Sequence, residues 1–163
     1  LSEEDLVDVT NEAATPPDLN DATGDVDSSG FTDQGWYIKL DPGEKVLAEG
    51  TVFYKAFYVT TFTPNNEPCV PGGAAKIYAL SHLTGAAVLD FDNSGTPSRS
   101  KEIGGGIPSK PVTVITPEGA TLLISVGSTS PDAASISVEA GIVTQKPMEP
   151  PANFFYLWWR EVF

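Results

Sequence analysis

Residues 50–92 contain the feature that most constrains the fold, a dense succession of short extended segments. Each segment is rich in β-branched and aromatic residues, which favours a pleated, half-buried surface. A turn-rich break at residues 63–73 and a hairpin signal at Leu83-Thr84-Gly85 separate them. Four short antiparallel strands in about forty residues have the period of one β-propeller blade. We therefore expect strands at residues 52–54, 57–62, 76–80 and 86–92.

The rest of the chain predicts further strands and no convincing long helix. Residues 35–40 read as a strand, and residues 92–110 read as a loop. A hairpin is predicted at 112–116 and 121–126, around the turn Pro117-Glu118-Gly119, and another strand at 136–140. We expect an all-β fold of antiparallel sheets, with an acidic N-terminal segment at 1–34 and a β domain at 35–163. Within that domain, 50–92 is a blade-like unit and 112–163 a second, looser one.

Two blades are too few for a closed propeller, which needs about four to eight. The alternatives are a partial propeller and a small β-sandwich completed by partners. The C-terminal segment 154–163 is apolar on both faces of a strand, so it must be covered on both. Either this segment is buried in the chain's own core or it docks on a partner. The predicted partner-binding residues are Phe154, Tyr156, Trp158 and Trp159.

Charge excludes some partners and favours others. The net charge is −13, and residues 1–33 hold ten acidic residues and no Lys or Arg. Such a chain repels nucleic acid and phospholipid surfaces and attracts hard cations. No run of eighteen apolar residues occurs, so no membrane span is predicted. The chain begins without Met or a signal-like segment, which leads us to expect a processed protein or part of a longer one.

An acidic loop at residues 25–33 has the spacing of a calcium site. Oxygen side chains stand at loop positions one, three, five and nine, with Gly30 at position six where the chain must turn sharply. The closing Glu of an EF-hand is replaced by Trp36, so this is a shorter loop of the D-x-D-x-S-x-x-x-D kind. A solvated acidic turn is the alternative. The predicted Ca²⁺ ligands are Asp25, Asp27, Ser29, Asp33 and the carbonyl of Phe31.

A second, weaker loop repeats the start of this pattern with Asp90, Asp92 and Ser94. Here an ordinary hairpin end with Asx-type turns is the preferred interpretation. The lone Cys69 either forms a disulfide with a thiol outside this chain or is a buried, unpaired thiol. The single histidine, His82, sits beside a turn, and no nucleophile elbow, zinc-binding HExxH or CxxC motif is present. The chain is therefore expected not to be an enzyme.

Several short pieces together point to a known family. Taken in order they resemble the C-terminal region of the PilY/PilC family, the large tip-associated proteins of bacterial type IV pili, and they cover most of residues 6–163. The pieces are Gly35-Trp36-Tyr37-Ile38, Glu44-Lys45-Val46-Leu47-Ala48-Glu49, Tyr58-Val59-Thr60-Thr61-Phe62-Thr63-Pro64, Pro68-Cys69-Val70-Pro71-Gly72-Gly73, Ile77-Tyr78-Ala79-Leu80 with Thr84-Gly85, Gly106-Ile107-Pro108-Ser109, and Trp159-Arg160-Glu161.

The resemblance implies a β-propeller domain, secretion to the cell surface, calcium-dependent control of pilus extension and retraction, and adhesion. The family's calcium loop has a D-x-D-x-x-x-x-x-D form, which residues 25–33 resemble. Family members are far longer and carry an N-terminal adhesive region that this chain lacks. The expected partners are pilin or other filament subunits, or the remainder of a longer parent protein. The alternatives are a fragment of a quinoprotein-like propeller enzyme and a carbohydrate- or surface-binding β-sandwich.

Overall fold

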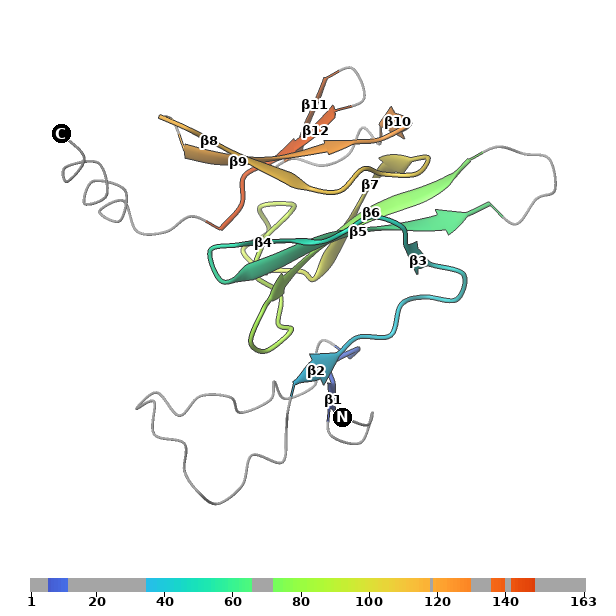
Figure 1. The fold of residues 1–163 in the computed structure, drawn as a ribbon, viewed down its shortest axis with the longest axis vertical. Helices are drawn as coiled ribbons and strands as arrows, with labels where there is room; N and C mark the ends of the chain where they lie inside the picture. Colours follow the sequence, from blue (N-terminus) through green and yellow to red (C-terminus); the bar gives the residue numbers. More distant parts are fainter. Residues whose placement is uncertain are drawn as a thin grey trace.

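The computed structural model describes residues 6–11, 35–65, 72–117, 119–129, 136–139 and 142–148. Every regular element in these ranges is a strand, and the two main sheets are antiparallel, so the predicted all-β class is confirmed. Figure 1 shows the two sheets stacked face to face, with a short strand pair beyond the larger sheet. The described ranges contain no helix long and apolar enough to cross a membrane.

The larger sheet is built around the long hairpin β5–β6, whose strands pair along nine residues each. Its order is β10-β7-β6-β5-β3, and β4 pairs with the other half of the outer edge of β5. The predicted strands at 52–54, 57–62 and 76–80 correspond to β4, β5 and β6. The bounds are β3 Lys45–Val46, β4 Thr51–Phe53, β5 Ala56–Pro64, β6 Gly73–Ser81, β7 Ser100–Gly105 and β10 Ser128–Thr129.

The smaller sheet has the order β11-β12-β9-β8. The predicted hairpin is present as β8 and β9, and the strand predicted at 136–140 is β11. This sheet is not the consecutive meander of a blade, because the chain passes through β10 in the larger sheet between β9 and β11. Of the two predicted architectures, the described part of the chain therefore matches the sandwich. The bounds are β8 Val112–Thr116, β9 Gly119–Ser125, β11 Ile136–Glu139 and β12 Ile142–Gln145.

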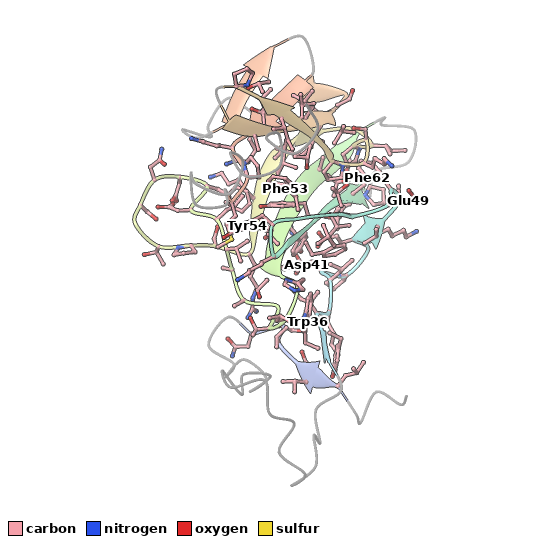
Figure 2. The ribbon with its side chains drawn as sticks, turned by 60° about the vertical axis from the view of Figure 1, so that its left-hand side comes forward. Trp36, Asp41, Glu49, Phe53, Tyr54 and Phe62 are labelled. Atoms are coloured by element: carbon pink, nitrogen blue, oxygen red, sulfur yellow. The ribbon has the colours of Figure 1, made fainter. Side chains whose placement is uncertain are left out.

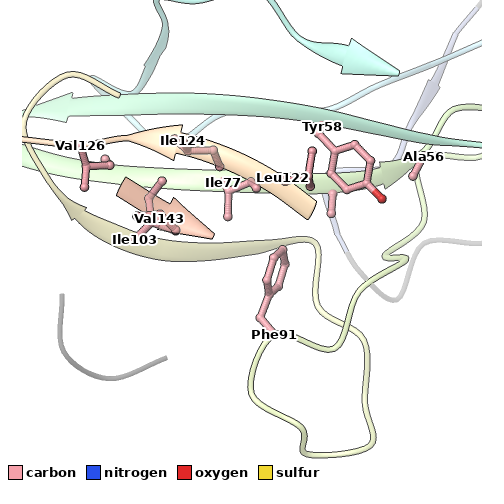
Figure 3. Close-up of a cluster of buried hydrophobic side chains, with 11 residues drawn as sticks. Ala56, Tyr58, Ile77, Phe91, Ile103, Leu122, Ile124, Val126 and Val143 are labelled. Carbon is pink, nitrogen blue, oxygen red and sulfur yellow. The ribbon is translucent and has the colours of Figure 1, made fainter. Parts of the chain in front are cut away.

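The main core lies between the two sheets. Side chains alternate along each strand, so every second residue of β5 and β6 points toward the smaller sheet and meets its inward residues. Fully burying one large apolar side chain contributes about 1.5–3 kcal/mol, so this layer holds the sheets together. Figure 3 shows the cluster, which comprises Ala56, Tyr58, Ala75, Ile77, Ala79, Phe91, Ile103, Leu122, Ile124, Val126 and Val143.

Two predictions about the end of the blade-like unit are wrong. Residues 86–92 make only the isolated bridges Leu80↔Ala87 and Leu89↔Ser98, and the strand beside β6 is β7, inside the predicted loop 92–110. The carboxylate of Asp90 accepts backbone N–H groups of the following turn, which offers this backbone an alternative to a strand. Strand β7 contains Gly104 and Gly105, which are poor strand formers on their own, and its place is determined by pairing.

The short pair β1 (Val7–Asp8) and β2 (Trp36–Tyr37) is parallel and lies beyond the larger sheet in Figure 1. The strand predicted at 35–40 is therefore much shorter than expected. Buried Val9 and the buried guanidinium of Arg99, which donates to the carbonyls of Val9 and Thr10, attach this pair to the larger sheet. The described residues of the acidic N-terminal segment thus pack on the β domain.

Candidate binding groove

Strands β5 and β6 are apolar on both faces. Their inward residues form the main core, while Phe57 and Val59 of β5 and Tyr78 and Leu80 of β6 point to the opposite, outer face. An antiparallel sheet with one solvent-exposed face would carry polar residues on that face. The outer face of the larger sheet is therefore expected to be covered by other residues.

Residues 36–40 lie against this outer face and cover part of it, and the chain then continues to β3 at the edge of the same sheet. Trp36, Ile38 and Leu40 pack against a second buried cluster of Val59, Tyr78 and Leu80. Between this part of the chain and the sheet lies an apolar depression of about 330 Å³, which we call the outer groove. Glu49 is the one charged residue of its lining. The lining consists of Trp36, Ile38, Leu40, Val46, Ala48, Glu49, Gly50, Phe57, Val59, Tyr78 and Leu80.

A buried carboxylate holds the turn that leads into the groove wall. Glu44 has a fully buried side chain, which accepts a hydrogen bond from the Thr61 hydroxyl and one from the Asp41 amide at 3.2 Å. Lys76 Nζ lies 2.7 Å from Asp41 Oδ2 and 3.4 Å from Glu44 Oε2. A buried charge is tolerated only when it is paired and hydrogen-bonded, as Glu44 is. This network positions Leu40 and Val46 along the groove.

The same network shapes the electrostatics of the groove. Burial, followed by the negative charge of Glu44, raises the pKa of Tyr78 to about 12. The hydrogen bond to Asp41 raises the pKa of Lys76. At neutral pH the Tyr78 phenol is therefore uncharged, and the Lys76 ammonium is charged and engaged by the two carboxylates. The groove is suited to an uncharged, apolar occupant.

Trp36 forms the far end of the groove and is fixed by the turn that holds His82. Its Nε1 donates to the His82 carbonyl at 3.2 Å, and Figure 2 shows Trp36 between the short strand pair and the larger sheet. The His82 ring Nδ1 lies 2.7 Å from the Lys55 carbonyl, which can only accept, so Nδ1 carries the proton. The histidine thus links its own turn to the turn at Lys55. The Lys55 turn is left-handed at both central residues, with φ of 39° at Tyr54 and 63° at Lys55.

The weaker predicted calcium loop is a set of nested turns. Asp90 Oδ1 accepts the amides of Asp92 and Ser94, Asp90 Oδ2 accepts the Gly95 amide at 2.6 Å, and Asp92 Oδ1 accepts the Ser94 amide. These hydrogen bonds form Asx-type turns, and the calcium site at this loop stays a prediction. Hydrogen bonds donated by Ser94 lower the pKa of Asp92. In the described ranges no three His, Cys, Asp or Glu side chains gather as metal ligands.

The other predicted sites lie outside the described residues, so each stays a prediction. They are the calcium ligands Asp25, Asp27, Ser29, Phe31 and Asp33, the thiol of Cys69, and the partner-binding residues Phe154, Tyr156, Trp158 and Trp159.

The outer groove was not predicted from the sequence. The available signal was the two-faced apolar pattern of Phe57-Tyr58-Val59 and Ile77-Tyr78-Ala79-Leu80, which indicates a sheet covered on both sides. No protein family model, no curated protein and no solved structure matches the chain.

Proposed function

We propose that this chain is a calcium-stabilised β module of a secreted, type IV pilus-associated protein, and that it assembles with a filament at the cell surface. The support from sequence is the resemblance to the C-terminal region of the PilY/PilC family. Within the described residues, the pieces that carry this resemblance fall mainly on the larger sheet and on the residues at 36–40 that pack on its outer face. The resemblance therefore concerns one contiguous structural unit. We propose a binding role without catalysis.

The observation that carries assembly is the edge strand β8. It ends the order of the smaller sheet, and no described strand pairs with its outer side. Four of its five residues are exposed, and its sequence, VTVIT, has high strand propensity and no charge. Native proteins usually protect such an edge with charge, proline or a bulge, because an extended segment can add to it. We propose that a filament subunit adds a strand to this edge.

Co-sedimentation with purified type IV pilus filaments tests this role. We expect the full chain to pellet with filaments in calcium. A Val114→Lys variant, with a charge on the edge strand at a position 38% exposed, should lose this binding. The matched control is Ile107→Lys, which places the same charge on a loop residue that is 63% exposed, and it should bind normally. A wild-type chain that stays in the supernatant, or equal binding by both variants, contradicts the proposal.

Calcium is tested separately by thermal unfolding. A ligand that binds only the folded state at a concentration about 100 times its Kd adds about 2.7 kcal/mol of stability. We expect calcium to raise the Tm of the wild-type chain and of an Asp18→Asn/Asp21→Asn variant. An Asp25→Asn/Asp27→Asn variant, with the same change of net charge, should show no rise. If calcium leaves all three chains unchanged, the calcium loop is wrong.

A carbohydrate-binding role has one supporting observation, the aromatic residues Trp36, Phe57 and Tyr78 in the groove lining. A sugar also needs a set of convergent polar groups, and Glu49 is the lone charged lining residue. A glycan array probed with the full chain separates the two roles. Specific glycan binding that is lost on Trp36→Ala would favour the carbohydrate role.

A further inference from the structure

We infer that the outer groove is occupied by the chain's own C-terminal aromatic segment, residues 154–159. The groove lies on an apolar surface that requires cover. Buried residues line its floor, while Val46 at its rim is 49% exposed. Exposed apolar surface of this kind marks a binding site when it is concave.

The size and chemistry of the groove define its occupant. A cavity of about 150 Å³ can hold a benzene molecule, so the outer groove, at about 330 Å³, has room for about two aromatic rings. Its lining includes Trp36, Phe57 and Tyr78, and the Tyr78 phenol is neutral at physiological pH. The geometry points to an uncharged segment that carries consecutive or alternating aromatic side chains.

The chain contains one stretch of that kind outside the described residues. Residues 154–159 read Phe-Phe-Tyr-Leu-Trp-Trp, with no charge and five aromatic side chains. In an extended segment, Tyr156 and Trp158 lie on the same face, so two rings can enter one groove together. The charges begin only afterwards, at Arg160 and Glu161.

The position at which the described chain ends makes this docking possible. The amide of Met148 donates to the Tyr58 hydroxyl at 3.0 Å, and Tyr58 pairs with Thr51, the residue after Gly50 of the groove lining. Because Tyr58 points into the core, Met148 lies on the inner side of the larger sheet, and the following residues must pass around the sheet edge at β4 to reach the outer groove. Six residue steps from Met148 to Phe154 reach about 20 Å when extended, and packed sheets are about 10 Å apart. The prolines at 150 and 151 favour such an extended spacer.

Site-specific photocrosslinking of the full chain tests this inference. We would replace Tyr156 by the photoreactive residue p-benzoylphenylalanine, irradiate the monomer, and map the products by mass spectrometry. The expected result is crosslinks within one chain to groove residues such as Leu40 and Val46. Crosslinks to the smaller sheet, crosslinks only between chains, or the absence of any crosslink would each overturn the inference.

Two variants sharpen the result. In the photoreactive chain, Val46→Glu places a carboxylate in the groove lining, so the yield of crosslinks to Leu40 should fall about tenfold. The matched control is Val52→Glu on β4, which is 63% exposed and outside the lining, and its yield should stay unchanged. Equal yields would also overturn the inference. This test is independent of filament binding, because it involves neither β8 nor a partner.

Discussion

Gly85 provides a quantitative test of how the short strand pair is held against the larger sheet. It is buried and left-handed, with φ of 66°, and a Cβ atom at this position would lie 2.8 Å from Trp36 ring carbons and from Val9 Cγ2. Gly95 has a similar φ of 85°, but a Cβ atom there would meet nothing within 4 Å. The two glycines therefore separate backbone strain from steric contact.

The expected magnitudes follow from these two terms. Each alanine must adopt a left-handed conformation, which costs about 1–2 kcal/mol. Gly85→Ala also forces Trp36 or Val9 to move, and overpacking of this kind costs about 1–3 kcal/mol more. We therefore expect Gly95→Ala to lower the free energy of unfolding by about 1–2 kcal/mol and Gly85→Ala by about 2–5 kcal/mol.

Urea unfolding followed by tryptophan fluorescence measures both losses, with thermal unfolding as a second readout. For a chain of this size, 1 kcal/mol corresponds to about 2–4 °C in Tm. Gly85→Ala should also change the fluorescence of the folded state, because Trp36 is in contact, whereas Gly95→Ala should not. Equal losses in the two variants would refute the reasoning, since strain alone would then explain both.

Three further predictions concern single groups. Lys55→Gly should be about 0.5–1 kcal/mol more stable than Lys55→Ala in urea unfolding, because φ at this exposed residue is 63°; equal stabilities would contradict it. Burial raises the pKa of Tyr78 to about 12, so the neutral phenol contributes its full stabilisation below about pH 10. As the pH rises from 10 toward 12, the free energy of unfolding should fall by about 2–3 kcal/mol. Tyr78→Phe should flatten this alkaline loss, and an unchanged profile would show that the phenol is not buried. Hydrogen bonds from Thr10, followed by Lys39, lower the pKa of Asp8. The ionised carboxylate therefore stabilises the folded state above about pH 4, and this stabilisation is lost as the pH falls. Asp8→Asn should make Tm less sensitive to acid, and an equally steep acid profile would contradict this.

The strands that could be predicted are those whose residues favour strands on their own. β5 and β6 contain runs such as Phe57-Tyr58-Val59-Thr60 and Ile77-Tyr78, and the hairpin β8–β9 has both propensity and a turn signal. β7 could not be predicted in this way, because its sequence, SKEIGG, is weakly strand-forming and its position depends on pairing with β6. The reverse error at residues 86–92 has a local cause, since the Asp90 carboxylate engages the backbone of the next turn.

The groove was harder to predict from the sequence than the sheets that form it. The two-faced apolar pattern of β5 indicates that something covers the outer face, but not which segment does so. The covering residues, 36–40, contain only the short strand β2, and the turn that follows them is held by Glu44, a residue that sequence patterns place on a solvated turn. A buried acid with a satisfied network depends on partners far along the chain, at Thr61 and Lys76, which no local pattern reveals.

The described residues also connect the predicted calcium loop with the groove. The chain between β1 and β2 is closed at its base, because Val7 donates to the Gly35 carbonyl and Val9 to the Tyr37 carbonyl, each at 3.0 Å. Residues 25–33 lie inside this closed segment, and only Gln34 and Gly35 separate their last acid from Trp36 of the groove lining. Closing a loop costs entropy that grows slowly with its length, so an ion that gathers residues 25–33 favours the same closed base that positions Trp36. If calcium binds as proposed, adding it should therefore both raise the stability of the chain and order the groove wall at Trp36.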